Sequence, residues 1–248
     1  MLSFLDPGIV PPLLVGAVFA ASLLQAVTGI GFGVIAGPIL LVTMASAGAI
    51  QVSIVLSFLI ALLLAPITLP LVNWRLLRPL FAGVCLGTPI GALAYLNLTL
   101  DNLKLFAAVV VGAMTVIATG VLARYPFFQT DSARRRGVVG VFCGVLNAAL
   151  AMPGPPVAAY VTAIKSDPNI VRATTLVTFL LSYPIALGFQ ALFVGVSDTL
   201  APTVTALALP TVGGTLSGVI MARILRARHL KWLTVLFLMI STLMLVMK

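Results

Sequence analysis

The chain has 248 residues, of which 61% are hydrophobic and only 8% are charged, with a formal net charge of +9 and a mean hydropathy of +1.23. These values exclude an ordinary soluble globular protein and indicate a polytopic membrane protein. Because the basic residues lie in short stretches between long apolar runs, the positive balance indicates membrane topology and not a nucleic-acid-binding surface.

Apolar runs bounded by charged residues, Pro or Gly predict a series of helices. In chain order they cover residues 11–28, 34–46, 49–71, 79–97, 103–123, 137–152, 156–165, 170–194, 199–222 and 231–247. A helix needs about 20 residues to span a bilayer, and the segments 34–46 and 156–165 are too short. Each follows a Gly or Pro interruption, and the two occupy corresponding places in the two halves of the chain. The sequence therefore predicts an all-α membrane protein built from two repeats, residues 1–123 and 124–248.

An overlay of the two halves supports this repeat. Each matched pair is weak alone, because Gly is common in membrane helices, but the order of elements repeats along the whole chain. The overlay places Gly87, Thr88 and Gly91 on Gly214, Thr215 and Gly218, Leu103–Lys104 on Leu230–Lys231, Ser57–Phe58 on Thr178–Phe179, and Gly31 on Gly154.

The basic residues indicate how often the short segments cross the membrane. If each short segment forms a hairpin with the helix before it, near residues 29–38 and 152–157, twelve basic residues lie on one side and only Lys104 and Lys248 on the other. A single crossing by residues 137–166 would break this asymmetry, against the positive-inside rule. We therefore predict two inverted repeats, each a re-entrant or broken hairpin plus three transmembrane helices. Both termini are expected outside, and this architecture is typical of secondary transporters.

The two interruptions predict an anion site. Helices that begin in mid-membrane leave their first backbone N–H groups without partners. Both short segments run away from their interruptions, so both direct a partially positive N-terminus at the protein centre. Glycines let the backbone approach a ligand closely, and proline is tolerated in a first helical turn. The backbone part of the predicted site comprises Gly29, Gly31, Gly33, Gly154 and Pro155.

Polar side chains near the interruptions complete the predicted site. They are Gln25, Thr28, Asn147, Arg172 and Thr174. The amides and hydroxyls either form interhelical or capping hydrogen bonds or bind the oxygens of the anion. Arg172 either sets topology at the inner surface or reaches a sulfonate or carboxylate with its planar fork of donors. Tyr183 and Gln190, on the segment 170–194, either line a path or pack between helices.

The inventory of ionisable residues argues against cation coupling and against catalysis. All acidic residues are predicted in loops or at helix ends, so none is expected to carry a proton or sodium within the membrane. They are Asp6, Asp101, Asp131, Asp167 and Asp198. An anion that leaves a cell with a negative interior gains about 2.3 kcal/mol per charge per 100 mV. With one histidine and no nucleophile beside a base, we expect no enzyme, no metal site and no cofactor.

Four stretches make the chain similar to a known family. They are "TGIGFGVIAGP", "MPGPPVAAYV", "NWRLLRPLFAGVCLGTPIGA" and the Arg-Ala-Thr sequence that begins at Arg172. Together they resemble the sulfite exporter TauE/SafE family, and the resemblance covers nearly the whole chain. It implies outward movement of small sulfur-containing anions, such as sulfite, sulfoacetate or related sulfonates, across the bacterial inner membrane.

We therefore expect a secondary transporter that alternates access to an anion bound between the two half-helix N-termini. Its expected partners are a small anion and the lipid bilayer, with no nucleic acid, and a homodimer is left open. The alternatives are an anion channel of the same architecture and a carrier of carboxylates that contain no sulfur.

Overall fold

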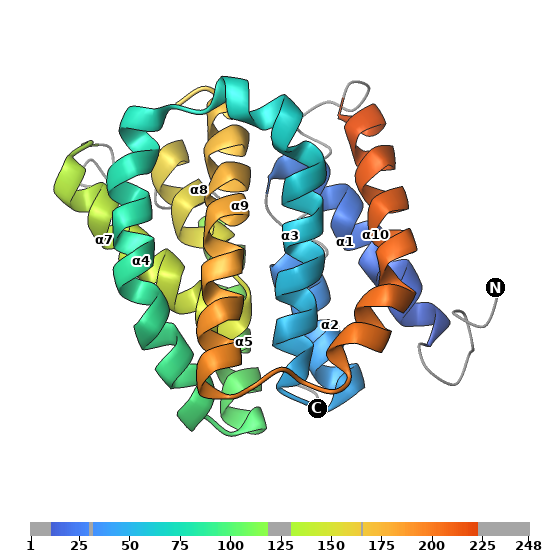
Figure 1. Ribbon diagram of the computed structural model, residues 1–248. Helices are drawn as coiled ribbons and strands as arrows, with labels where there is room; N and C mark the ends of the chain where they lie inside the picture. The colour runs from blue at the N-terminus through green and yellow to red at the C-terminus, as the bar shows by residue number, and fades with distance from the viewer. Residues whose placement is uncertain (1–10, 30–31, 119–129, 165, 223–248) are drawn as a thin grey trace.

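A computed structural model of the protein describes residues 11–29, 32–118, 130–164 and 166–222 (Figure 1). The described chain is helical, as predicted, and the predicted helix 231–247 lies outside it. The elements are α1 (Pro12–Thr28), α2 (Phe32–Met44), α3 (Gly48–Thr68), the short 3-10 helix η2 (Leu69–Leu71), α4 (Trp74–Asn97), α5 (Leu100–Ala118), α7 (Ala133–Leu150), α8 (Gly154–Ala163), α9 (Pro168–Phe193) and α10 (Leu200–Met221).

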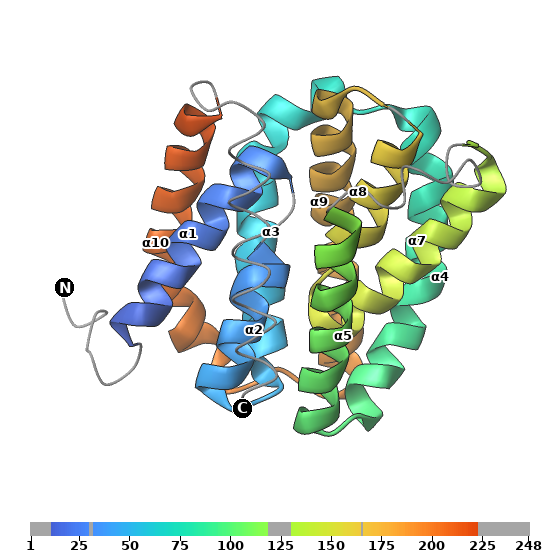
Figure 2. The ribbon, with the colours of Figure 1, turned by 180° about the vertical axis from the view of Figure 1, so that it is seen from behind.

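The helices form one bundle around a central pair. Figures 1 and 2 show α3 and α9 side by side in the middle, with α4 and α7 packed together on one flank and α1 and α10 on the other. The short helices α2 and α8 both begin near mid-height. From there α2 runs toward one end of the bundle and α8 toward the opposite end.

Polar side chains set where two of the helices begin. The side chain of Asn73 accepts hydrogen bonds from the backbone N–H groups of Arg75 and Leu76, so α4 begins at Trp74 and not at residue 79 as predicted. The Ser132 side chain accepts from the N–H of Arg135. Because such caps pair N–H groups that the helix leaves free, each helix extends into the basic stretch before its apolar run.

Glycines allow the flanking helices to pack backbone against backbone. A Cβ atom added to Gly87 of α4 would lie 2.0 Å from the carbonyl oxygen of Val141 in α7. One added to Gly214 of α10 would lie 2.3 Å from the carbonyl oxygen of Phe19 in α1. Small residues permit this close approach in membrane helix pairs, so the two helices of each flank are closely packed.

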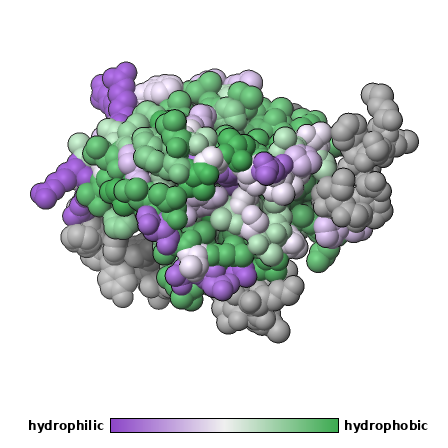
Figure 3. Space-filling model, turned by 60° about the horizontal axis from the view of Figure 1, so that its bottom comes forward, coloured by the Kyte–Doolittle hydropathy of each residue, from purple (hydrophilic) through white to green (hydrophobic). Residues whose placement is uncertain are grey.

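Four helical segments in the described chain are long and apolar enough to cross a membrane. They are Gly48–Leu71, Trp74–Asn97, Asn169–Phe193 and Leu200–Met221. Large apolar side chains on all four are exposed, among them Leu62, Leu86, Leu192 and Leu209. Figure 3 shows broad hydrophobic areas on the face that it presents, interrupted by separate hydrophilic patches. Such a surface suits contact with lipid acyl chains.

The N-terminal ends of α4, α7 and α9 lie at the same end of the bundle (Figure 1). There the side chain of Arg136 donates a hydrogen bond to the carbonyl oxygen of Arg75 at 2.9 Å and forms an ion pair with Asp131. The Tyr160 hydroxyl of α8 donates to the same carboxylate. This network joins the outer end of α8 to the starts of α4 and α7. The side of the membrane that this end faces stays a prediction.

Candidate functional site

The first interruption lies between α1 and α2. After Thr28 the chain turns at Gly29, which adopts a left-handed conformation (φ 78°) and donates its N–H to the Gln25 carbonyl oxygen at 2.8 Å. The side-chain oxygen of Gln25 accepts the N–H of Phe32, the first residue of α2, at 3.1 Å. Gln25 therefore binds both edges of the interruption. Gly31 lies outside the described residues.

The second interruption, between α7 and α8, has the same local geometry. Ala151 follows α7 in the left-handed conformation (φ 58°) and donates its N–H to the Asn147 carbonyl oxygen at 2.8 Å. A new helix then begins at Gly154, with Pro155 in its first turn. A backbone N–H at this position would have no acceptor within the helix, so proline, which lacks this N–H, costs no hydrogen bond. Both short helices begin two residues before their predicted starts at 34 and 156, and α2 continues through Pro38 without a break.

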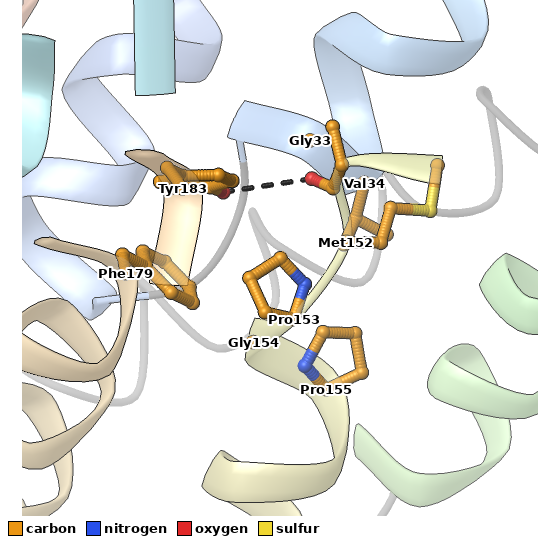
Figure 4. Close-up of a pocket in the computed structure, with 9 residues that line it drawn as sticks. Gly33, Val34, Met152, Pro153, Gly154, Pro155, Phe179 and Tyr183 are labelled. Atoms are coloured by element: carbon orange, nitrogen blue, oxygen red, sulfur yellow. Dashed lines mark hydrogen bonds between the residues drawn. The ribbon is translucent and has the colours of Figure 1, made fainter. Parts of the chain in front are cut away.

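The two interruptions meet in the protein centre. A Cβ atom added to Gly33 of α2 would lie 2.0 Å from the carbonyl oxygen of Ala151, so only glycine allows this contact. A small cavity lies beside it, with a volume of about 10 Å³, roughly what one water molecule needs. Figure 4 shows the residues around it. The cavity is lined by Gly33, Val34, Ala151, Met152, Pro153, Gly154, Pro155, Phe179 and Tyr183.

This arrangement directs the N-terminal ends of α2 and α8 toward one point. Each end carries a partial positive charge from the aligned peptide dipoles of its helix. The Gln25 side chain is fully buried, and its amide nitrogen, beside the first turn of α2, has no hydrogen-bond partner among the described residues. A buried donor without a partner is unfavourable, so the first interruption offers a hydrogen bond that an anion can accept.

Arg172 contacts the first interruption from α9. Its guanidinium donates to the carbonyl oxygen of Ala26, in the last turn of α1. A Cβ atom added to Gly29 would lie 3.1 Å from the Cα atom of Arg172. Helix C-termini favour a cation, so Arg172 stabilises the end of α1. Neither of the two interpretations drawn from the sequence included this contact.

Among the described residues of the predicted site, only three line the cavity, namely Gly33, Gly154 and Pro155. The others, Gln25, Thr28, Gly29, Asn147, Arg172 and Thr174, do not. The Thr28 hydroxyl donates to the carbonyl oxygen of Leu24 at 2.7 Å, a bond within its own helix. Asn147 and Thr174 are fully buried. Within the described chain, no partner pairs with the Asn147 side-chain amide or with the Thr174 hydroxyl. These two side chains are therefore available to a ligand only if it extends beyond the cavity.

A family model described as "Sulfite exporter TauE/SafE" matches residues 14–245. The chain belongs to this family. No curated protein and no solved structure matches it.

Membership of the TauE/SafE family makes the chain a multi-pass membrane protein of a transporter family, not of an enzyme family. The family transports sulfur-containing anions such as sulfite. The acidic residues that the structure describes agree with a site for anions, since none lies within the four spanning segments. The described residues also contain no group of three His, Cys, Asp or Glu side chains that could hold a metal ion.

Two aromatic residues in the wall of this cavity were not predicted as site residues from the sequence. Phe179 was not predicted there, and Tyr183 was assigned either to a path or to packing. Both come from α9 and their rings lie 5.4 Å apart between centroids. Their spacing of one helical turn is a signal for a shared face. The sequence does not say that this face meets the second interruption, because that depends on how α9 packs.

Proposed function

We propose that the protein is a secondary transporter that exports small sulfur-containing anions, such as sulfite, sulfoacetate or similar sulfonates, and binds them between the N-termini of α2 and α8. The observation that carries the proposal is the meeting of these two helix ends beside a buried, unpartnered Gln25 amide. Backbone N–H groups and an amide donor suit the oxygens of a sulfonate or carboxylate.

Equivalent contacts in the two halves support an inverted repeat. The same sequence spacing separates Gln25 from Asn147, Gly29 from Ala151 and Phe32 from Gly154. The members of each pair have the same local role, as the carbonyl acceptor, the left-handed residue and the first residue of the short helix. This register pairs Gly154 with Phe32, one residue later than the pairing with Gly31 in the sequence overlay. We infer two re-entrant hairpins of inverted orientation.

The glycine contacts on the two flanks repeat in the same way. Gly87 approaches the carbonyl of Val141, and Gly214 approaches that of Phe19. Val141 and Phe19 are themselves related by the spacing that relates Asn147 to Gln25. Each repeat therefore contributes the helix on which the glycines of the other repeat pack, as expected for two halves related by pseudo-twofold symmetry.

The tight contact between the interruptions favours a carrier over a channel. A sulfonate head group is larger than the cavity of about 10 Å³, so α2 and α8 must separate before an anion can bind. A channel needs a continuous pore, whereas alternating access needs a closed state of this kind. We propose that the basic end of the bundle faces the cytoplasm of a bacterium and that both termini lie outside. A reporter fused to the C-terminus that reads cytoplasmic would contradict this orientation.

Purified protein tested against sulfite, sulfoacetate, taurine, acetate and sulfate separates the alternatives. We expect saturable binding of sulfite or sulfoacetate by calorimetry, and saturable flux of the bound anion in proteoliposomes. Preferential binding of acetate would indicate a carboxylate carrier instead. An ohmic current that does not saturate would indicate a channel, and failure to bind any of the anions would contradict the proposed function.

A further inference from the structure

The cavity between the interruptions has one polar side chain in its wall. Of the nine residues that line it, only Tyr183 carries a side-chain hydrogen-bonding group. Its side chain is 1% exposed. The hydroxyl donates to the carbonyl oxygen of Ala151 at 3.5 Å, and Ser57 of α3 lies beside it. Hydroxyl hydrogen bonds are ordinarily 2.5–3.0 Å long, so Tyr183 holds a donor in a long, weak contact at the centre of the protein.

The carbonyl that Tyr183 contacts also closes the site. The Ala151 oxygen lies between the Tyr183 hydroxyl and Gly33, in the first turn of α2 (Figure 4). This oxygen carries a partial negative charge close to the positive end of α2, the position that suits an oxygen of an anion. An anion that enters between α2 and α8 must displace it. The Tyr183 hydroxyl then loses its carbonyl acceptor and faces the entering group.

We propose that Tyr183 is a substrate-contacting residue whose hydroxyl donates to Ala151 when the interruptions are closed and to an oxygen of the anion when they separate. This inference rests on the proposed function, because it assumes an anion at the cavity. Phe179 packs against the Tyr183 ring from one turn away and holds it in place during the exchange. The exchange replaces a weak neutral hydrogen bond by one to a charged acceptor, which is stronger.

The test compares Tyr183→Phe with a matched control. Tyr95 of α4 is 5% exposed and its hydroxyl donates to the Ala47 carbonyl oxygen at 3.1 Å, but Tyr95 does not line the cavity. Tyr95→Phe therefore removes the same kind of bond elsewhere. With sulfite and sulfoacetate as probes, we expect Tyr183→Phe to raise Kd about tenfold or more, as loss of a hydrogen bond to a charged group should. Tyr95→Phe should change Kd less than about twofold.

The outcomes separate this inference from the proposed function. If the wild-type protein binds either probe and Tyr183→Phe binds it equally well, Tyr183 makes no substrate contact. Equal losses in both variants would show that the effect is structural, and would also overturn the inference. If the wild-type protein binds neither probe, the proposed function fails and the inference fails with it.

A second measurement needs no change at Tyr183. The chain has four tyrosines, which 3-fluorotyrosine can replace for fluorine NMR. The Tyr183 signal is the one that remains when Tyr95, Tyr125 and Tyr160 are replaced singly by Phe. We expect sulfoacetate to shift this signal more than the other three. A Tyr183 signal that stays unchanged at saturating sulfoacetate would overturn the inference.

Discussion

A methyl group at Gly33 should prevent the two interruptions from closing. The backbone of Gly33 is helical, so Ala is compatible with its conformation. The added Cβ atom would, however, lie 2.0 Å from the carbonyl oxygen and 3.1 Å from the carbonyl carbon of Ala151. Both partners are backbone atoms, so no side chain can rotate away. The helix α2 or the loop at Ala151 must move by at least about 1.4 Å to restore an ordinary contact distance.

The expected effect of Gly33→Ala on transport follows from the free-energy cost of this shift. Overpacking by one methyl group in a packed core ordinarily costs about 1–3 kcal/mol. Because the clash exists only when the interruptions touch, the cost falls on the closed conformation. A cost of about 2 kcal/mol lowers the ratio of closed to open protein about 30-fold. A carrier that must pass through the closed state should then transport correspondingly more slowly.

The assay is flux of sulfite or sulfoacetate in proteoliposomes, together with thermal unfolding of the purified protein. We expect Gly33→Ala to lower flux at least tenfold and to lower Tm. Gly16→Ala is the control, because Gly16 is exposed on α1 and an added Cβ atom would meet nothing within 4 Å. A Gly33→Ala protein with wild-type flux and Tm would refute the backbone contact on which the proposed site depends.

Two further predictions concern stability. Gly87→Ala and Gly214→Ala should lower Tm by similar amounts. Both should lower it more than the control Gly188→Ala, whose added Cβ atom would meet nothing within 4 Å. A large effect at only one of Gly87 and Gly214 would contradict the inferred symmetry. The pKa of Asp131 lies below its ordinary value of 3.8, chiefly because Arg136 donates to its carboxylate. A lowered pKa stabilises the fold above that ordinary value, and the stabilisation is lost as the pH falls through the folded-state pKa. The Asp131→Asn variant should therefore be less stable than wild type at pH 7, by about 1 kcal/mol or less, because the Asp131–Arg136 pair is exposed. The difference in Tm should vanish near pH 2. A difference that persists at this pH would exclude the ion pair as its cause.

Helix boundaries show the limit of reading local sequence. The apolar runs predicted every described helix, but the starts of α4 and α7 lay several residues earlier than expected. Asn73 and Ser132 cap these helices, so the basic residues after them form first turns. Capping depends on one side chain and the orientation of its neighbours, whereas hydropathy averages over a window of residues.

The contacts of the Arg172 and Tyr183 side chains could not be predicted from the sequence. Both were recognised as candidates, yet their partners, the Ala26 carbonyl of α1 and the Ala151 carbonyl just after α7, lie far from them in the chain. Helices that are apolar on all sides carry no amphipathic stripe that identifies an inward face. The sequence therefore did not indicate which helix each of them would contact.

The sequence by itself determined that the chain crosses a membrane, that two of its helices are too short to span it, and that a break in the chain precedes each of these two helices. These features follow from local composition, because apolar length and backbone freedom are properties of short segments. Only the tertiary structure decided that the Ala151 carbonyl rests on Gly33 and that Phe179 and Tyr183 complete the cavity. Those contacts join residues far apart in the chain, and packing between helices creates them.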